Sequence, residues 1–201
     1  MLEVLYEDNH LIAINKKAGD IIQADKTGDI PLSDFVKKYI KKKYNKPGDV
    51  FLGTIHRLDR PTSGVILFAR TSKALSRMNQ QFKNKEIDKT YWAIVNHAPP
   101  KNKGTLNNFL KKNKKKNKSF ITNNQSEGKK ATLEFKTLKK LDNFYHLEIK
   151  PKTGRHHQIR AQLANIGCII KGDLKYGAKR SNKDASIHLL AKKIKFIHPV
   201  K

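Results

Sequence analysis

The residues best suited to chemistry lie between His56 and Gly64, where the sequence reads His-Arg-Leu-Asp-Arg-Pro-Thr-Ser-Gly. Asp59 stands between Arg57 and Arg60, and nearby guanidinium groups favour the ionised form of a carboxyl group. An ionised, positioned carboxylate can act as a nucleophile, a general base or a metal ligand. For an arbitrary Asp beside Arg, however, a surface ion pair is the commoner outcome. The segment is therefore a candidate site whose role must come from its surroundings.

A second polar segment, Thr-Gly-Arg-His-His-Gln-Ile-Arg, covers residues 153–160. We expect a helix over 153–165 with Arg155 at its N-terminus, where backbone N–H groups and the helix dipole attract anions. On such a helix His156 and His157 point about 100° apart, so they do not form a paired set of metal ligands. Ile159 falls on the apolar stripe of this helix and is expected in the core.

A third segment, Lys89 to Val95, has the period of a strand. Alternation places Tyr91 on one face and Trp92 on the other. Tyr91 can stack on a base or move a proton, although most strand tyrosines are simply half-buried packing residues.

Other chemistries find less support. His56, Ser63 and Asp59 could be combined into a triad, but the sequence has no Gly-x-Ser-x-Gly elbow. It has no Gly-rich phosphate loop, so no nucleotide cofactor is expected, and no His-Glu-x-x-His motif, so no metal is expected.

Composition indicates a polyanionic partner. The 201 residues include 43 Lys+Arg and 17 Asp+Glu, giving a net charge of +26, and a field this positive attracts nucleic acid. The chain has no apolar run of about 18 residues that would span a membrane. A single cysteine, Cys168, excludes an internal disulfide, and the N-terminus lacks the pattern of a secretory signal. We expect one domain over residues 1–201 in the cytoplasm.

The elements expected from periodicity interleave irregularly, which predicts a mixed α/β sheet. Helices are expected at 31–44, 72–84 and 153–165, with Ser72 capping the second. Strands are expected at 2–6, 11–15, 51–55, 65–68, 90–95, 132–138, 144–149, 187–190 and 192–197. Residues 101–118, rich in Lys and Asn, are expected to form a basic, mobile insertion loop that can touch phosphate.

Together, the three segments resemble the RluA-type RNA pseudouridine synthases. His56 to Gly64 resembles the family's His-Arg-Leu-Asp-x-x-Thr-Ser-Gly motif, Lys89 to Val95 its Lys-x-Tyr-x-Ala-x-Val strand, and residues 153–160 its Thr-Gly-Arg-x-His-Gln-Ile-Arg segment. Further similarity lies at Tyr6-Glu7-Asp8, Asn15-Lys16, Gly172-Asp173, Tyr176-Gly177, His188 and His198-Pro199. Lys17 departs from the family's usual Pro, and Cys168-Ile169 from its usual His-Pro. We expect a single catalytic domain without the S4 RNA-binding domain of many relatives.

This resemblance implies an α+β pseudouridine synthase fold, with a mixed, largely antiparallel sheet flanked by helices and two packed halves around a central active-site cleft. It also implies an isomerase that converts uridine in RNA, either 23S rRNA or tRNA, to pseudouridine without a cofactor or metal. We expect the enzyme to be a monomer.

The resemblance also implies roles for individual residues. Asp59 would be the nucleophile, attacking either the sugar C1′ or the base C6, and Arg155 would pair with it. Tyr91 would stack on the target base and assist removal of the C5 proton, and Ile159 would line the uracil pocket. Arg57 would fill the gap left in the RNA stack by a flipped nucleotide. His56, Arg60 and Arg160 are expected to contribute to substrate binding.

Two other functions compete with this one. A non-catalytic, basic RNA-binding or ribosome-associated protein would explain the charge but not the Asp59 motif. A metal-independent nuclease using His56 and an arginine is the weaker alternative.

Overall fold

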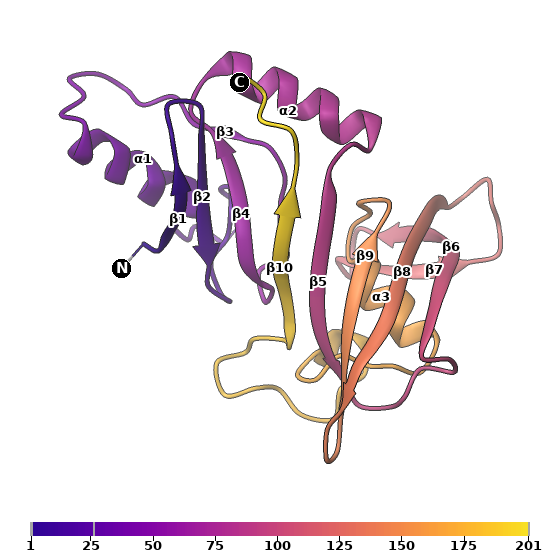
Figure 1. The fold of residues 1–201 in the computed structure, drawn as a ribbon. Coiled ribbons are helices and arrows are strands. Elements are labelled where there is room, and N and C mark those ends of the chain that lie inside the picture. The colour runs from indigo at the N-terminus through magenta and orange to yellow at the C-terminus, as the bar shows by residue number, and fades with distance from the viewer. Residues whose placement is uncertain (1, 26, 201) are drawn as a thin grey trace. The chain divides into compact units, whose positions relative to one another are not determined.

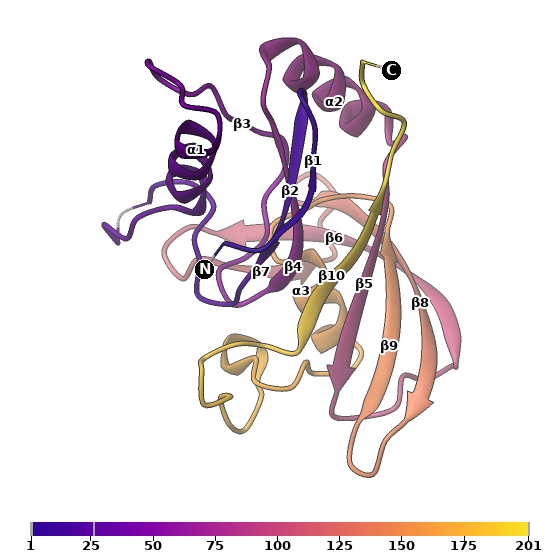
Figure 2. The same cartoon turned by 60° about the vertical axis from the view of Figure 1, so that its left-hand side comes forward.

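The computed structural model describes residues 2–25 and 27–200, which divide into two compact units (Figures 1 and 2). The first unit holds the described residues up to Ile87 and those from Ile194 onward, and the second holds Asp88–Lys193. The sequence predicted one domain of two packed halves around a central cleft; the single domain and the cleft stay predictions. Within the described ranges, no helix is both long and apolar enough to cross a membrane.

The sheet of the first unit is antiparallel, in the order β1–β2–β4, and β3 pairs with β4. The strands are β1 (Val4–Glu7), β2 (Leu11–Lys16), β3 (Gly53–Thr54) and β4 (Ser63–Ala69). The strand expected over 51–55 is thus only two residues long, whereas the strand expected at 65–68 is longer.

Both faces of this sheet are buried, which explains why β2 and β4 read as continuous apolar runs. Leu11 and Leu67 lie on the face that packs with Met78 of helix α2 (Ser72–Asn84). Ile14 and Phe68 lie on the other face, in one core with α1 (Leu32–Lys43). The two helices were expected at these places, but the cap of α2 is Thr71 rather than Ser72: Ala74 N donates to the Thr71 side chain over 3.2 Å.

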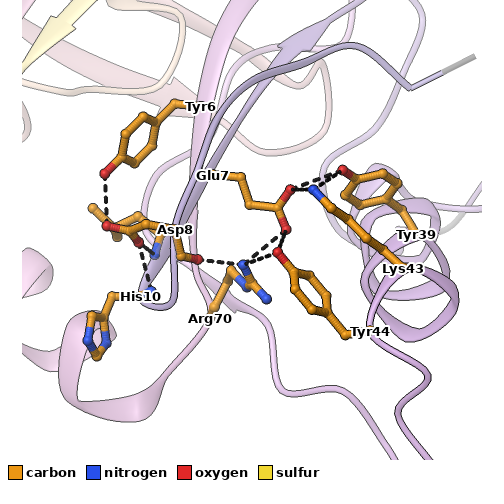
Figure 3. Close-up of polar contacts among 9 residues, drawn as sticks. Tyr6, Glu7, Asp8, His10, Tyr39, Lys43, Tyr44 and Arg70 are labelled. Atoms are coloured by element: carbon orange, nitrogen blue, oxygen red, sulfur yellow. Dashed lines mark hydrogen bonds and ion pairs between the residues drawn. The ribbon is translucent and has the colours of Figure 1, made fainter.

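A buried carboxylate fastens α1 to the sheet (Figure 3). Glu7, whose side chain is 8% exposed, accepts hydrogen bonds from Lys43 at 2.6 Å, Tyr44 at 2.9 Å, and Tyr39 and Arg70 at 3.0 Å. Although burial raises the pKa of Glu7, the hydrogen bonds from Lys43 and the two tyrosines outweigh it and hold this pKa below its usual value. The carboxylate thus joins β1, α1 and the end of β4.

The second unit holds a strand order β10–β5–β9–β8–β6–β7, with antiparallel pairing from β5 to β7. The strands are β5 (Asp88–Val95), β6 (Lys103–Asn113), β7 (Lys118–Thr122), β8 (Lys129–Lys140), β9 (Tyr145–Pro151) and β10 (Leu189–Lys195), whose last two residues belong to the first unit. Helix α3 (Gln158–Asn165) packs Ile159 and Leu163 against Ala93, Leu147 and Ile149 of the sheet. The expectation of an α+β fold with largely antiparallel pairing is confirmed.

The prediction that residues 101–118 form a loop is wrong. Residues 103–113 form β6, and only 114–117 connect it to β7. Lysine can occupy a strand because its methylene stem covers apolar surface while its ammonium stays in water. The many lysines of this segment therefore obscured the alternation of buried and exposed side chains in its sequence. Similarly, 187–190 and 192–197 were expected as two strands and yield one, β10.

Candidate active site

In the first unit, a buried lysine binds the backbone of the Asp59 segment. Lys16, at the end of β2, is 1% exposed, and its Nζ donates to three backbone carbonyls. The acceptors are Thr62 O at 2.7 Å, Arg60 O at 3.0 Å and Lys17 O at 3.0 Å. Gly19 N also donates to Arg60 O over 2.9 Å. One ammonium therefore ties the turn after Asp59 to the turn after β2.

Asp59 itself is half-buried in this turn, and its carbonyl accepts from Thr62 N over 3.0 Å. Burial is the main influence on Lys16 and lowers the pKa of its ammonium to about 8, while the charges of Asp20 and Asp59 oppose this change. The charge of Asp59 thus interacts with the Lys16 ammonium. The backbone that follows Asp59 is held by the hydrogen bonds from Lys16.

The other polar residues of this segment take different places. His56 Nε2 accepts a hydrogen bond from Leu67 N of β4 over 3.1 Å, and its ring stacks on Phe82 with centroids 5.5 Å apart. This placement favours a structural role for His56 over substrate contact, and it leaves the nuclease hypothesis without an available Nε2. Arg57 is exposed, as insertion into RNA requires, whereas Arg60 forms an exposed ion pair with Asp29 at 2.7 Å.

In the second unit, Tyr91 lies on β5 opposite Ile149 of β9 and packs at the edge of the apolar core. Lys89 is two residues earlier and therefore on the same face. Burial lowers the pKa of Lys89, and its Nζ lies 3.8 Å from the position that a Cβ on Gly154 would take. The structure thus brings the start of β5 and the 153–155 turn together.

Arg155 does not begin a helix, contrary to the sequence expectation. Helix α3 starts at Gln158, and residues 152–157 form the turns before it. Polar side chains hold this approach: Thr153 Oγ1 donates to Gln158 Oε1 over 2.7 Å, and Gln158 Nε2 donates to Thr132 O over 3.0 Å. Arg155 is exposed, and its Nε donates to Lys130 O over 3.0 Å. These competing hydrogen bonds explain why the helix begins late.

The two histidines of this turn also differ from expectation. His157 has a left-handed backbone, with φ of 52°, and the rings of His156 and His157 stack with centroids 3.8 Å apart. The sequence predicted that the two rings point in different directions because it placed both histidines on a helix. Helix α3 begins only after them. Ser119 and Tyr176 contact one histidine each, so both rings belong to a packed polar cluster. No group of three or more metal-ligating side chains is found among the described residues.

The last two candidates are buried in the second unit. Ile159 is 7% exposed within the apolar core. Arg160 is 4% exposed and forms a two-pronged pair with Asp173, with Nε and Nη2 at 2.7 and 2.8 Å from the two oxygens. The position of Asp173 depends on Gly172, because a Cβ there would lie 2.7 Å from Ser186 O and its φ is +86°. Burial favours a structural role for Arg160 over the expected substrate contact.

The candidates therefore form two groups. His56, Arg57, Asp59 and Arg60 lie in the first unit, and Tyr91, Arg155, Ile159 and Arg160 in the second. The pairing of Asp59 with Arg155 stays a prediction. Sequence reasoning included Lys16 in the resemblance but gave it no role. The available signal was a lone lysine closing a strand buried on both faces.

Comparison with known proteins supports the motif assignment. The family model described as RNA pseudouridylate synthase matches residues 10–165. The ribosomal large subunit pseudouridine synthase C of Rickettsia prowazekii is 37% identical over 177 residues, covering 88% of this chain and 56% of that protein. The tRNA pseudouridine synthase C of Vibrio vulnificus is 34% identical over 217 residues, covering 99% of this chain and 86% of that protein. The chain thus spans about half the length of the Rickettsia relatives it matches.

Two solved structures share the fold. Human RNA Pseudouridylate Synthase Domain Containing 4 superposes with a TM-score of 0.82 at 22% identity, covering 96% of this chain and 84% of that one. Human RNA Pseudouridylate Synthase Domain Containing 1 gives a TM-score of 0.80 at 22% identity, covering all of this chain and 80% of that one.

Proposed function

Because the chain belongs to the RNA pseudouridylate synthase family, we propose that it isomerises uridine in RNA to pseudouridine. The observation that carries the proposal is the Asp59 turn, whose backbone is bound on its inner side by the Lys16 ammonium. A nucleophilic carboxylate needs a fixed direction, and the three hydrogen bonds from Lys16 supply the fixed backbone.

The reaction breaks the N1–C1′ glycosidic bond and forms a C5–C1′ bond. The hydrogen on C5 is lost and N1 gains one, so the product is an isomer of the substrate. In our proposal Asp59 attacks C1′ or C6 to form a covalent intermediate, and Tyr91 stacks on the base and assists removal of the C5 proton. Arg155 pairs with Asp59, and Ile159 forms an apolar wall of the uracil pocket.

A uridine must leave its stack before its C5 and C1′ can be reached, which costs a few kcal/mol. Arg57 is exposed and planar at its tip, so it can occupy the place of the flipped base. Extraction is easier from loops and bulges, where bases are already poorly stacked. We therefore propose an unpaired uridine as the target.

The substrate is proposed from the names of the relatives, which are described as acting on the ribosomal large subunit or on tRNA. Large-subunit rRNA and tRNA are accordingly the two candidates. Modification of either RNA would place the protein in the cytoplasm. We further propose that it acts as a monomer without cofactor, because an internal nucleophile and a proton acceptor suffice for an isomerisation.

Tritium release from RNA transcribed with C5-tritiated uridine tests the proposal directly, since forming the C5–C1′ bond must expel the C5 hydrogen. Wild type should release tritium from one of the two RNAs, and Asp59→Ala should not. Asp59→Asn should likewise be inactive while still shifting the RNA in a gel. Release by Asp59→Ala at the wild-type rate would remove Asp59 from its role.

The same samples separate the competing functions. A non-catalytic RNA-binding protein would shift both RNAs without any release of tritium from wild type. A nuclease would shorten the RNA during incubation, and the structural placement of His56 already argues against it.

A further inference from the structure

The hairpin of β6 and β7 carries the densest positive charge of the chain on a fixed backbone. No Asp or Glu occurs between Phe109 and Thr122, and the lysines of this stretch are Lys111, Lys112, Lys114, Lys115, Lys116 and Lys118. Lys111 pairs with Glu127. We call Lys114, Lys115 and Lys116 the tip lysines; all three are exposed.

The turn that presents the tip lysines is ordered by its own polar groups. Asn113 Oδ1 accepts from Lys116 N over 2.9 Å, and Asn117 N donates to Lys114 O over 3.3 Å. Asn117 has a φ of 43°, a left-handed conformation that asparagine tolerates. The three ammonium groups therefore extend from a closed turn rather than from a loose loop.

The turn end of the hairpin is anchored to the rest of the second unit. Tyr176 Oη donates to Ser119 O over 2.8 Å and accepts from Ser119 N over 3.0 Å, and Ser119 Oγ lies 2.9 Å from His156 Nδ1. Lys175 Nζ donates to Asn117 O over 3.2 Å. Figures 1 and 2 show α3 beside β7, and the two elements are in contact. An anchored hairpin loses little conformational entropy when it binds a partner.

Cations of the hairpin and its neighbours lie around the buried ring of His157. Burial is the main cause that lowers the pKa of His157 to about 2, and the charges of Arg160, His156, Lys175 and Lys112 lower it further. Such a concentration of cations, without carboxylates along the hairpin, suits a polyanion rather than a mixed-charge protein surface.

An exposed aromatic ring completes the surface. Phe120 on β7 is 42% exposed and lies opposite Lys111 of β6 in the register of the hairpin. An exposed ring near exposed cations suits single-stranded nucleic acid, because phosphates pair with lysines while a base stacks on the ring.

We propose that the β6–β7 hairpin is an RNA-docking arm, in which the tip lysines bind backbone phosphates and Phe120 stacks on an unpaired base. The proposal rests on the proposed function, because it assigns a docking site to the RNA substrate. Its test measures binding alone, so it can fail or succeed independently of catalysis.

The first experiment compares the salt dependence of RNA binding by filter binding. The variant Lys114→Gln/Lys115→Gln/Lys116→Gln is compared with a control triple on β8, Lys136→Gln/Lys139→Gln/Lys140→Gln, whose lysines are also exposed. Each phosphate neutralised on a single strand contributes about 0.7 to the slope of log K against log salt, so the tip variant should lower the slope by about 2. The same relation raises Kd roughly 50-fold at ~0.15 M salt, whereas the control should behave like wild type.

The second experiment tests the stacking contact. Phe120→Ala is compared with Leu138→Ala on β8, because both residues are 42% exposed. Loss of a stacked base should raise Kd about fivefold or more with an unchanged salt slope. Phe120→Trp should restore binding, and Leu138→Ala should bind as wild type.

Equal salt slopes for the tip variant and wild type, or equal losses in the tip and control triples, would overturn the docking arm. So would wild-type affinity in both the tip variant and Phe120→Ala. Tritium release on the same samples reports the proposed function separately: wild type that binds through the hairpin but releases no tritium would refute the synthase and keep the arm.

Discussion

Lys16 Nζ lies 2.7 Å from the carbonyl oxygen of Thr62, three residues beyond Asp59 in the chain. The ammonium is 1% exposed and also binds the carbonyls of Arg60 and Lys17. Burying an ammonium is costly, and it is tolerated here because all three of its N–H groups are used. The candidate nucleophile therefore lies in a turn whose backbone is bound by a residue of strand β2.

Replacing Lys16 by Met should loosen this turn. Three carbonyls lose their donor, so the free energy of unfolding should fall by about 1–3 kcal/mol in urea titrations. Turnover should fall while RNA affinity stays near wild type, because the change displaces Asp59 rather than a surface cation. Lys17→Met, at the exposed neighbouring position, is the matched control. Equal effects from the two variants would contradict the role of the Lys16 hydrogen bonds in holding the turn.

The stability of the protein should also report the protonation of Lys16. Its pKa falls to about 8 in the folded chain from 10.5 in the unfolded chain, chiefly through burial. Between these pH values the unfolded state holds a proton that the folded state has released, so the free energy of unfolding should rise with pH. One proton corresponds to a slope of about 1.4 kcal/mol per pH unit. Urea unfolding at pH 8 and pH 10 should show this slope in wild type relative to Lys16→Met.

The buried Arg160–Asp173 pair should be a major determinant of the stability of the second unit. Asp173→Asn leaves a 4% exposed guanidinium without its counter-charge, which should cost about 3–5 kcal/mol. Glu134→Gln breaks an ion pair with Lys152 in which both side chains are about half exposed, and it should cost at most about 1 kcal/mol. Thermal unfolding should separate the two variants; similar midpoints would show that burial of the pair adds nothing.

Acid should destabilise the protein through His157. Its pKa is lowered to about 2 mainly by burial, whereas an unfolded histidine has a pKa of about 6.5. Below pH 6.5 the unfolded state takes up a proton that the folded state refuses, so stability should fall by up to about 1.4 kcal/mol per pH unit. His157→Asn suits the left-handed backbone and should flatten the profile between pH 7 and pH 5. The exposed His97→Asn should retain the wild-type profile.

Tyr91→Phe keeps the ring and removes the hydroxyl. If the hydroxyl assists removal of the C5 proton, tritium release should fall by about 100-fold or more. The melting temperature and RNA affinity should stay near wild type, since the ring still packs against the core. Tyr145→Phe, another partly buried tyrosine at this core, controls for loss of a hydroxyl. Undiminished release from Tyr91→Phe would limit Tyr91 to stacking.

Local sequence was sufficient for the elements whose residues repeat with a clear period. Residues 32–43 and 72–84 form the expected helices because their apolar side chains return every three to four residues. The three motifs also follow one another along the chain in the same order as in the family they resemble. Family membership could therefore be inferred from the sequence alone. The charge pattern of the β6–β7 hairpin was visible too, although its lysines suggested a loop.

Tertiary structure decided what the side chains do. In the sequence, Lys16 and Arg160 are two of the many cations in a chain of net charge +26. Both can be buried because Thr62 O and the Asp173 carboxylate, which belong to other segments of the chain, satisfy their charges. The start of α3 moved to Gln158 because Thr132 and Thr153 supply competing hydrogen bonds. Periodicity describes the spacing of apolar residues along one element, whereas these hydrogen bonds join different segments of the chain.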